Sequence, residues 1–292
     1  MLDKDLSYFE TLALEAAWLA GDAIMHIYNQ MLREPENRHS DIRHKADGSP
    51  VTRADLNADW VIRKKLSESG FEVISEENSD KDWNKRKNLS TFWLVDPLDG
   101  TREFISQNGE FTVNIALIEN QLPILGVMLA PALNQSWSGF GKICRHYKQK
   151  QLTEERHTAA EGQTDRTAFP SGMRVLASRS HPDRQTLSLI SDLEKQFGSI
   201  RLINRGSALK IAELAMGEAD FYPRFGPTWE WDTAAGHAIL RAAGGEIFDM
   251  SCRQRLLYNK PDMLNPSFAG FRLCHDAARF FSGSVFVGPP AG

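Results

Sequence analysis

Two aspartates, Asp96 and Asp99, lie three positions apart directly after a short apolar run at residues 92–95. The run predicts a buried strand that stops at the proline after Asp96, because proline cannot donate to a following ladder. We expect Asp99 to cap a helix that opens at Gly100 and Thr101, where free N–H groups attract anions. Paired carboxylates beside such amides suit divalent cations that hold a phosphate. An acidic turn with a helix cap would explain the same residues without any chemistry.

Other acidic residues occur at the ends of further predicted elements. Glu76 follows a predicted strand at 71–75, and Asp232 starts a helix whose next residues are small enough for tight packing. Asp55 lies in the first turn of a helix capped by Thr52, where the helix dipole favours an acid for structural reasons alone. If the acidic element ends converge at one edge of a sheet, cations are needed to offset the repulsion between the carboxylates.

The composition excludes several classes of protein. The chain has 292 residues, 41% of them hydrophobic and 25% charged, with a net charge of −4. It has no long basic run, which argues against a nucleic-acid partner. Its three cysteines (Cys144, Cys252 and Cys274) are widely spaced, which favours a reducing compartment over a disulfide framework or a structural zinc site. The charged N-terminus does not resemble a signal peptide, and no apolar stretch reaches the roughly 18 residues that span a membrane.

The predicted elements indicate two α/β halves. The first half has predicted helices at 6–27 and 52–69 and strands at 71–75, 92–95, 112–118, 124–129 and 137–140, the last three antiparallel. We expect 78–90 to be a surface excursion and the polar segment 142–170 to be irregular. The second half alternates, with strands at 173–177, 200–203, 219–222 and 246–248 and helices at 183–197, 207–216 and 233–243. The halves are therefore expected to be residues 1–170 and 171–292, with a partly unstructured tail after 272.

Three motifs together resemble the inositol monophosphatase superfamily of lithium-sensitive, magnesium-dependent phosphatases. They are Glu76-Glu77, Asp96-Pro-Leu-Asp-Gly-Thr101 and Trp231-Asp-Thr-Ala-Ala-Gly236. The resemblance covers roughly residues 6–272 and implies an α/β fold of αβαβα layers. It also implies that the two halves form a single catalytic unit. About two or three Mg²⁺ ions would bind where the halves meet.

The resemblance also implies roles for individual residues. The implied metal ligands are Glu76, Asp96, Asp99 and Asp232 through their carboxylates and Leu98 through its backbone carbonyl. Gly100 and Thr101 would supply amides to the phosphate. Asp55 would orient Thr101, and Thr101 and Glu76 would help to position the attacking water and deprotonate it. The resemblance implies that this water attacks phosphorus directly and in line.

Other segments resemble one branch of the superfamily, the bisphosphate nucleotidases. Arg102-Glu103-Phe104, Ala177-Ser-Arg-Ser-His181 and Gly206-Ser-Ala-Leu-Lys210 are similar to nucleotidase segments, and matches at 108–114, 123–126 and 222–227 are similar to the bacterial CysQ type. The implied substrate contacts, besides Gly100 and Thr101, are Ser178, His181, Ser207, Lys210 and Asp232. The implied reaction removes the 3'-phosphate of adenosine 3',5'-bisphosphate, which clears a by-product of sulfur assimilation.

Alternatives stay open at several positions. His181 also fits a loop residue or a helix cap, Lys210 a solvated helix face, and Lys45 a surface lysine. Nothing in the spacing supports a phosphate contact for Arg224. Glu230, an acid where relatives mostly carry a neutral residue, either perturbs the metal site or faces solvent.

The function also has rivals. An inositol or sugar monophosphatase and a non-catalytic nucleotide sensor are the competing interpretations. We expect a cytoplasmic protein and leave open both its oligomeric state and a peripheral contact at the cytoplasmic face of the inner membrane.

Overall fold

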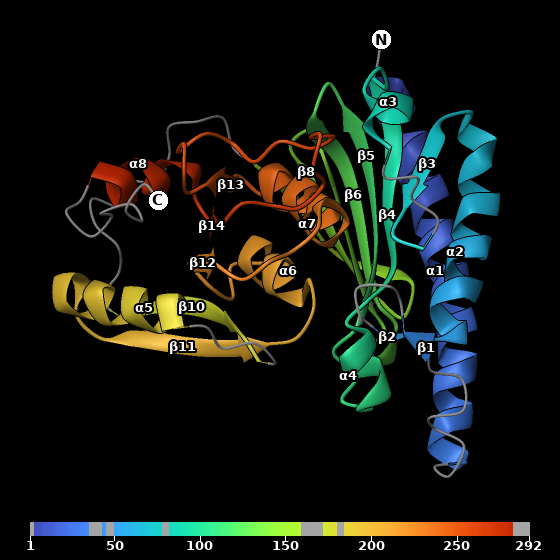
Figure 1. Ribbon diagram of the computed structural model, residues 1–292, viewed down its shortest axis with the longest axis horizontal. Helices are drawn as coiled ribbons and strands as arrows, with labels where there is room; N and C mark the ends of the chain where they lie inside the picture. The colour runs from blue at the N-terminus through green and yellow to red at the C-terminus, as the bar shows by residue number, and fades with distance from the viewer. Residues whose placement is uncertain are drawn as a thin grey trace.

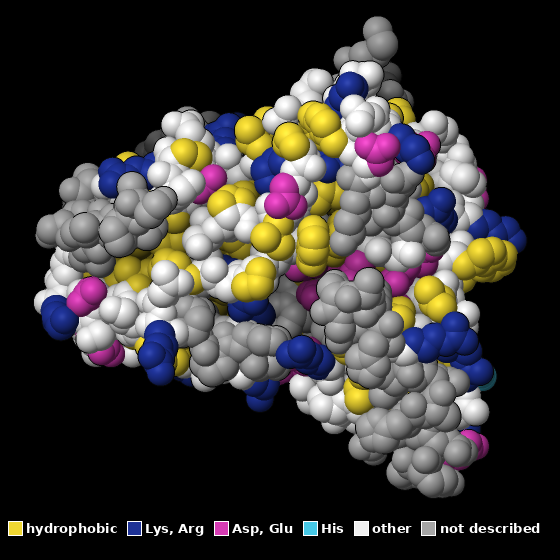
Figure 2. All heavy atoms as spheres, in the orientation of Figure 1, with side chains coloured by type: hydrophobic (Ala, Val, Ile, Leu, Met, Phe, Trp, Pro, Cys, Tyr) yellow, Lys and Arg dark blue, Asp and Glu magenta, His cyan; other side chains and the backbone are white. Residues whose placement is uncertain are grey.

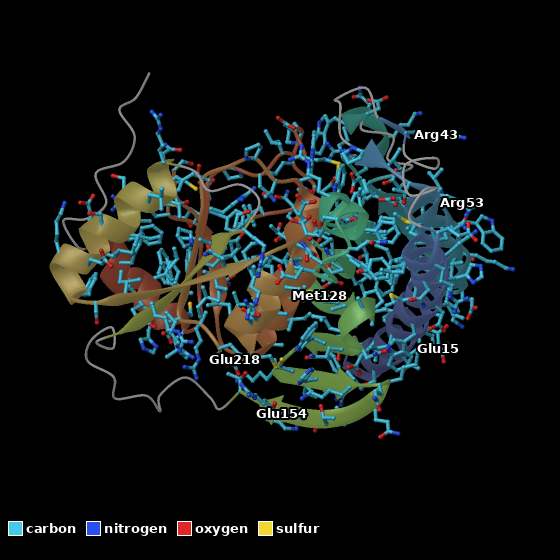
Figure 3. All side chains as sticks on the ribbon, turned by 90° about the horizontal axis from the view of Figure 1, so that it is seen from below. Glu15, Arg43, Arg53, Met128, Glu154 and Glu218 are labelled. Atoms are coloured by element: carbon cyan, nitrogen blue, oxygen red, sulfur yellow. The ribbon has the colours of Figure 1, made fainter. Side chains whose placement is uncertain are left out.

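The structure, a computed structural model, describes residues 3–34, 43–44, 50–77, 82–158, 172–179 and 184–282. It has five layers, in the order helix, sheet, helix, sheet, helix (Figure 1). In the view from below, Arg53 and Glu15 mark the outer helical layer and Met128 lies close to the middle of the molecule (Figure 3). The predicted αβαβα fold is therefore confirmed.

The outer helical layer consists of α1 (Asp3–Arg33) and α2 (Arg53–Leu66). Apolar residues recur every three or four positions along α1, and this stripe packs on α2 and on the large sheet. Thr52 caps α2 as predicted, and a short 3₁₀ turn, η2 (Ser67–Ser69), follows the helix. Both predicted helices are confirmed, and α1 extends beyond its predicted bounds at each end.

The large sheet has seven strands in sequence order, of which only β3 and β4 are parallel neighbours. Its strands are β3 (Glu72–Ser75), β4 (Thr91–Asp99), β5 (Thr112–Glu119), β6 (Leu122–Ala130), β7 (Gln135–Phe140), β8 (Ile143–Lys148) and β9 (Gln151–His157). A short 3₁₀ turn, η3 (Pro131–Leu133), lies between β6 and β7. The expectation of an irregular chain from 142 onward is wrong for β8 and β9. These two strands lie at the sheet edge with many polar, solvent-facing side chains, so they lack the apolar run that signals a strand.

Strand β4 departs from its prediction at the proline. The strand continues through Pro97 to Asp99, with a shift in its register against β5 between Asp96 and Asp99. A proline is tolerated at such an irregularity, because the ladder there does not need its missing N–H group. The prediction that the strand stops at Asp96 is therefore wrong, and both aspartates belong to one strand.

The small sheet has the strand order β11-β10-β12-β14-β13. Its strands are β10 (Met173–Ser178), β11 (Ile200–Arg205), β12 (Phe221–Arg224), β13 (Glu246–Asp249) and β14 (Phe268–Phe271). The helices α6 (Leu209–Ala215) and α7 (Glu230–Ala242) fill the space between the two sheets, and α5 (Arg184–Phe197) and α8 (Cys274–Ser282) cover the far face. The sequence analysis missed β14 and α8, and the tail is helical from 274 to 282. The division into halves at residue 170 stays a prediction.

Helix α7 packs unusually close to its neighbours, which fixes its position. A Cβ atom on Gly126 of β6 would lie 2.2 Å from the carbonyl oxygen of Ala235, so only glycine allows this approach. On the other side, a Cβ atom on Gly236 would lie 2.7 Å from the Cβ atom of Ile211 in α6. The prediction that small residues after Asp232 permit tight packing is confirmed.

The remaining elements are a small two-stranded sheet and two short helices. A two-stranded sheet joins β1 (Arg43–His44) to β2 (Pro50–Val51), and α4 (Thr101–Ile105) follows β4. Residues 82–90 are not a simple surface excursion, because they contain α3 (Trp83–Arg86) and Arg86 is only 2% exposed. Among the described residues, no helix has the length and hydrophobicity needed to cross a membrane.

Candidate metal centre and active site

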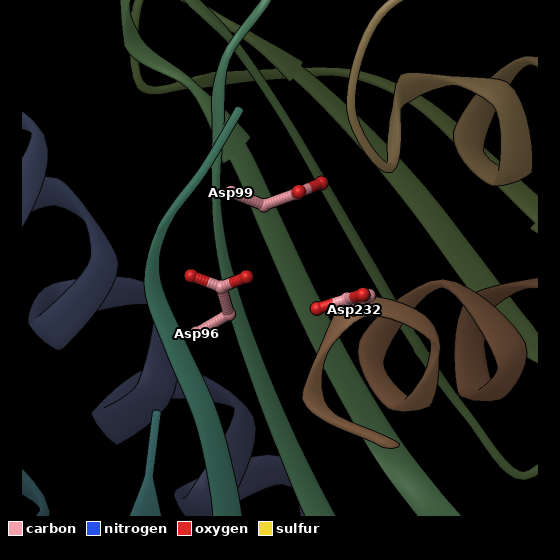
Figure 4. A group of neighbouring side chains, drawn as sticks. All are labelled: Asp96, Asp99 and Asp232. Atoms are coloured by element: carbon pink, nitrogen blue, oxygen red, sulfur yellow. The ribbon is translucent and has the colours of Figure 1, made fainter. Parts of the chain in front are cut away.

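Three aspartates meet between the large sheet and the inner helical layer. Asp96 and Asp99 project from β4, and Asp232 projects from the first turn of α7 (Figure 4). Each offers a carboxylate oxygen, and these oxygens all lie within 4.8 Å of one another. Residues that are 136 positions apart in the chain (232 − 96) therefore form one acidic cluster.

Each aspartate is oriented by a backbone N–H group. The amide of Leu98 donates to Oδ1 of Asp96 at 3.0 Å, and the amide of Ala208 donates to Oδ2 of Asp99 at 2.5 Å. The amide of Trp229 donates to Oδ2 of Asp232 at 2.8 Å. One oxygen of each carboxylate is thus used to fix its direction, and the second oxygen has no backbone donor among these bonds.

The prediction that Asp99 caps a helix is wrong. The N-cap of α4 is Gly100, which has a φ of 89° and makes no side-chain cap. This left-handed backbone favours glycine, and a Cβ atom there would also come within 3.2 Å of Ser207. Gly100 therefore turns the chain and lets the loop before α6 approach, while Asp99 accepts a bond from that same loop.

The electrostatics of the cluster fit a divalent cation. Burial, followed by the charges of Glu76, Asp99 and Asp232, raises the pKa of Asp96 well above its usual value. Burial and neighbouring carboxylates also raise the pKa of Asp232, and burial raises the pKa of Asp99 to about 6. Buried like charges disfavour one another's ionised forms, and a bound cation removes that penalty. The donors are all oxygens, as Mg²⁺ prefers.

The other two predicted metal ligands lie beside the cluster. The backbone N–H of Glu76, directly after β3, donates to the carbonyl of Val95 in β4 at 3.1 Å. Glu76 lines the same cavity as Asp99 and Asp232, but its carboxylate is not in the set of oxygens within 4.8 Å. Leu98 is buried in β4. Their ligand roles stay predictions.

Asp55 serves two purposes at once. It accepts bonds from the N–H and the hydroxyl of Thr52 at 2.7 and 2.6 Å, which completes the cap of α2. Its other oxygen accepts a bond from the hydroxyl of Thr101 at 3.2 Å. Burial raises the pKa of Asp55 to about 6, with the Thr52 bonds acting in the opposite direction. The structural role of Asp55 as part of the cap is confirmed, and its role in orienting Thr101 for catalysis stays a prediction.

A cavity of about 410 Å³ opens beside the cluster, and acidic side chains are visible in the hollow near the centre of the molecule (Figure 2). It is lined by eight predicted site residues, namely Glu76, Asp99, Gly100, Thr101, Ser178, Ser207, Lys210 and Asp232. His181 and Lys45 lie outside the described residues. Tyr222 and Phe268, which were not selected from the sequence, also line the cavity, and so does Arg224, for which the spacing supported no phosphate contact.

Lys210 and Arg224 are cationic residues that line the cavity, as Arg102 also does. Lys210 is 5% exposed and donates to the carbonyls of Arg205 and Ser207 at 3.2 and 2.5 Å, so the solvated-face alternative is wrong. Burial lowers the pKa of Lys210 to about 8, and the charge of Asp99 opposes that shift. Arg224, which ends β12, donates through Nη2 to the carbonyl of Pro227 at 3.4 Å, and its buried Nε has no hydrogen-bond partner among the described residues. Both cations are therefore placed to meet an anionic ligand.

The alternative in which Glu230 faces solvent is also wrong. Its side chain is fully buried, and it forms an ion pair with Lys260 at 2.6 Å. It does not line the cavity.

The raised carboxylate pKa values predict that stabilisation by Mg²⁺ grows with pH. Asp55 and Asp99, each with a pKa of about 6, bind protons in the folded state that the unfolded chain releases near pH 4, and so do Asp96 and Asp232, whose pKa values are raised well above the usual value. Their contribution to the stability of metal-free protein therefore falls as pH rises through 4 to 6. Because protons and Mg²⁺ compete for the oxygens of Asp96, Asp99 and Asp232, the rise in unfolding temperature on adding Mg²⁺ should be larger at pH 7.5 than at pH 5. Calorimetry at both values, with and without EDTA, measures this, and an equal rise at both would contradict the assignment.

Comparison with known proteins agrees with this geometry. Residues 5–276 match the Inositol monophosphatase family. The chain is 41% identical over 256 residues to the 3'(2'),5'-bisphosphate nucleotidase CysQ of Escherichia coli strain K12, a match that covers 85% of this chain and 94% of that protein. It is 34% identical over 261 residues to the same-named protein of Aggregatibacter actinomycetemcomitans, covering 87% of this chain and 89% of that protein.

Solved structures resemble the fold as well. CysQ from Bacteroides thetaiotaomicron has a TM-score of 0.77 and 39% identity, over 90% of this chain and 97% of that one. The inositol monophosphatase from Anabaena has a TM-score of 0.67 over 99% of this chain and 98% of that one, but at 20% identity it supports the fold alone.

Proposed function

The chain belongs to the inositol monophosphatase family, and we propose that it is a 3'(2'),5'-bisphosphate nucleotidase that removes the 3'-phosphate of adenosine 3',5'-bisphosphate to give AMP and phosphate. The observation that carries this function is the pairing of two features in one cavity. Asp99 and Asp232 of the three-aspartate cluster line the cavity, and Lys210 and Arg224 line it as well. A substrate with two phosphates matches such a site, because one phosphate can approach the metals while a cation holds the other.

We propose that Mg²⁺ occupies the acidic cluster. Asp96, Asp99 and Asp232 would hold the cations, with Glu76 and the carbonyl of Leu98 completing their shells. When bound, such ions stabilise charge on the phosphoryl oxygens and the leaving oxygen and lower the pKa of water. The number of ions follows from the family resemblance and is part of the proposal.

The chain's own residues then position the reacting groups. The hydroxyl of Thr101 is held by Asp55 at 3.2 Å and lies at the start of α4, beside the cavity. In the proposed reaction it orients the attacking water, and Glu76 accepts the proton of that water. The backbone amides of Gly100 and Thr101 would face the phosphate oxygens. No side-chain nucleophile is required, because water attacks phosphorus directly.

The rest of the cavity suits a nucleoside. Tyr222 and Phe268 form an edge-to-face aromatic pair with ring centres 5.6 Å apart, and both line the cavity. Aromatic and apolar walls are typical of sites that hold a base. Ser178, Ser207 and Lys210 would contact the sugar and the phosphates, and His181 remains a predicted contact.

A substrate panel tests the assignment. With Mg²⁺ present, we expect kcat/KM for adenosine 3',5'-bisphosphate to exceed that for inositol 1-phosphate by about 100-fold or more. The reason is that the inositol compound has no second phosphate for Lys210 and Arg224 to hold. Phosphate release measured for both substrates gives the ratio. The family resemblance also predicts inhibition by lithium. A higher kcat/KM for inositol 1-phosphate would instead identify an inositol monophosphatase, and binding without phosphate release would identify a nucleotide sensor.

We further propose that the halves 1–170 and 171–292 act as one catalytic unit. The acidic cluster supports this, because β4 supplies two aspartates and α7 supplies the third. A cytoplasmic location and a role in clearing the by-product of sulfur assimilation also remain proposals.

A further inference from the structure

Glu230 is a buried carboxylate that does not line the cavity, although it is close in sequence to Asp232 of the metal centre. Glu230 precedes Asp232 by two positions in the first turn of α7, and its side chain is fully buried. It accepts bonds from the backbone N–H groups of Asn259 and Lys260 at 2.6 and 3.0 Å, and it pairs with the Lys260 ammonium at 2.6 Å. A buried charge with this many partners fixes the two segments against each other, because breaking any one contact leaves a buried group unpaired.

The same segment reaches the other half of the molecule through Asn259. The side-chain amide of Asn259 donates to the carbonyls of Arg86 and Leu89 at 3.1 and 3.4 Å, and its oxygen accepts a bond from Arg86 at 2.9 Å. Arg86 also donates to the carbonyl of Pro261 at 2.8 Å. These contacts lie immediately before β4, the strand that carries two of the clustered aspartates.

Together these side chains connect the starts of the two elements that form the cluster. We call the set the buried tie; its members are Arg86, Asn259, Glu230 and Lys260. One end holds the chain that leads into β4, and the other holds the first turn of α7. Backbone contacts support the second end, since Glu230 donates to the carbonyl of Met263 at 2.9 Å and Trp229 pairs with Leu264.

We propose that Glu230 and Lys260 are positioning residues for the metal centre. Their ion pair, linked through Asn259 to the approach of β4, holds the start of α7 where Asp232 can share cations with the aspartates of β4. The inference rests on the proposed metal-binding role of those aspartates. The carboxylate of Asp232 repels those of Asp96 and Asp99, and this repulsion favours a larger separation of α7 from β4. The buried tie opposes that separation.

Magnesium binding to folded, substrate-free protein tests this inference by isothermal titration calorimetry. We expect Glu230→Gln and Lys260→Met each to weaken Mg²⁺ binding by about tenfold, because each removes the ion pair and loosens the first turn of α7. The double variant pairs two neutral side chains, so its Mg²⁺ affinity should return to within about threefold of wild type. With saturating Mg²⁺, kcat should stay close to wild type in all three.

A matched control and a milder variant keep the test decisive. Glu10→Gln alters another buried acid, which contacts Ser138 and Arg145 on the outer side of the large sheet, and it should leave Mg²⁺ affinity unchanged. Asn259→Gly removes only the bonds to residues 86–89, and glycine accepts the φ of 61° at this position. It should fold and bind Mg²⁺ about three- to tenfold more weakly, as loss of a few hydrogen bonds implies.

Three results would overturn the inference. They are an unchanged Mg²⁺ affinity in Asn259→Gly, single variants that lose thermal stability but bind Mg²⁺ like wild type, and a double variant that is no better than the singles. Failure of the wild-type protein to bind Mg²⁺ would instead refute the proposed function, so the two failures are distinguishable.

Discussion

Replacing Asp99 with asparagine should lower kcat for adenosine 3',5'-bisphosphate by about three orders of magnitude or more, because the metal centre loses a charged ligand. The amide has the same size and can still accept the bond from Ala208, so the fold should persist. The metal-free variant should unfold at the wild-type temperature or above it. Burial raises the pKa of Asp99 to about 6, so its charge at neutral pH costs stability that a neutral amide does not.

Steady-state phosphate release and thermal unfolding measure the two halves of this prediction. Asp22→Asn is a suitable control, since Asp22 is an exposed acid of α1 that forms an ion pair with the exposed Lys150. It should change neither quantity. A rate for Asp99→Asn near that of wild type would contradict the metal-ligand role, and loss of the folded state would show that Asp99 is structural.

Arg224→Met should lower kcat/KM for a substrate with two phosphates much more than for a substrate with one. The guanidinium lines the cavity with a buried Nε that has no hydrogen-bond partner among the described residues, so it is placed to receive an anion. We expect kcat/KM for adenosine 3',5'-bisphosphate to fall about 100-fold, as loss of a charge-assisted contact implies. Adenosine 3'-monophosphate, which lacks the second phosphate, should lose less than about threefold.

The monophosphate is the internal control for this variant, because general damage to the site would slow both substrates equally. Parallel losses would therefore contradict a specific contact between Arg224 and the second phosphate. Lys210→Met is a less selective test, since Lys210 also supports the loop at Arg205 and Ser207.

The sequence was informative where local patterns decide the structure. The apolar stripe of α1, the Thr52 cap of α2 and the apolar runs of β5 and β6 depend on neighbours in the chain, and all were predicted. The acidic cluster was predicted as well, because a motif of known spacing can be recognised without its tertiary contacts. Lys210 was selected by the same route, and the structure places it in the cavity.

The errors come from contacts that distant segments supply. Pro97 would end a strand if the neighbouring strand required a hydrogen bond from its nitrogen. The irregular pairing between β4 and β5 at this position requires none. The local sequence predicts that Asp99 caps the following helix. In the structure Asp99 instead accepts a hydrogen bond from the amide of Ala208, more than 100 positions later in the chain. Strands β8 and β9 carry mostly polar residues, so their pairing at the sheet edge left no apolar signal.

Buried charges form a second class of error. Arg86 and Glu230 are typical surface residues by composition, yet each is buried and hydrogen-bonded to residues that lie at least 29 positions away. No local rule identifies such partners. Arg224 was left undecided for the same reason, because its place in the cavity depends on how β12 packs against α6.

The most direct test of the account is a crystal of this protein soaked in Mn²⁺, which replaces Mg²⁺ at oxygen sites and gives an anomalous signal. We expect at least one anomalous peak held jointly by Asp96, Asp99 and Asp232, and we expect this peak to be lost in Asp99→Asn. A fully active wild-type enzyme whose aspartates hold no Mn²⁺ at saturating concentration would contradict it.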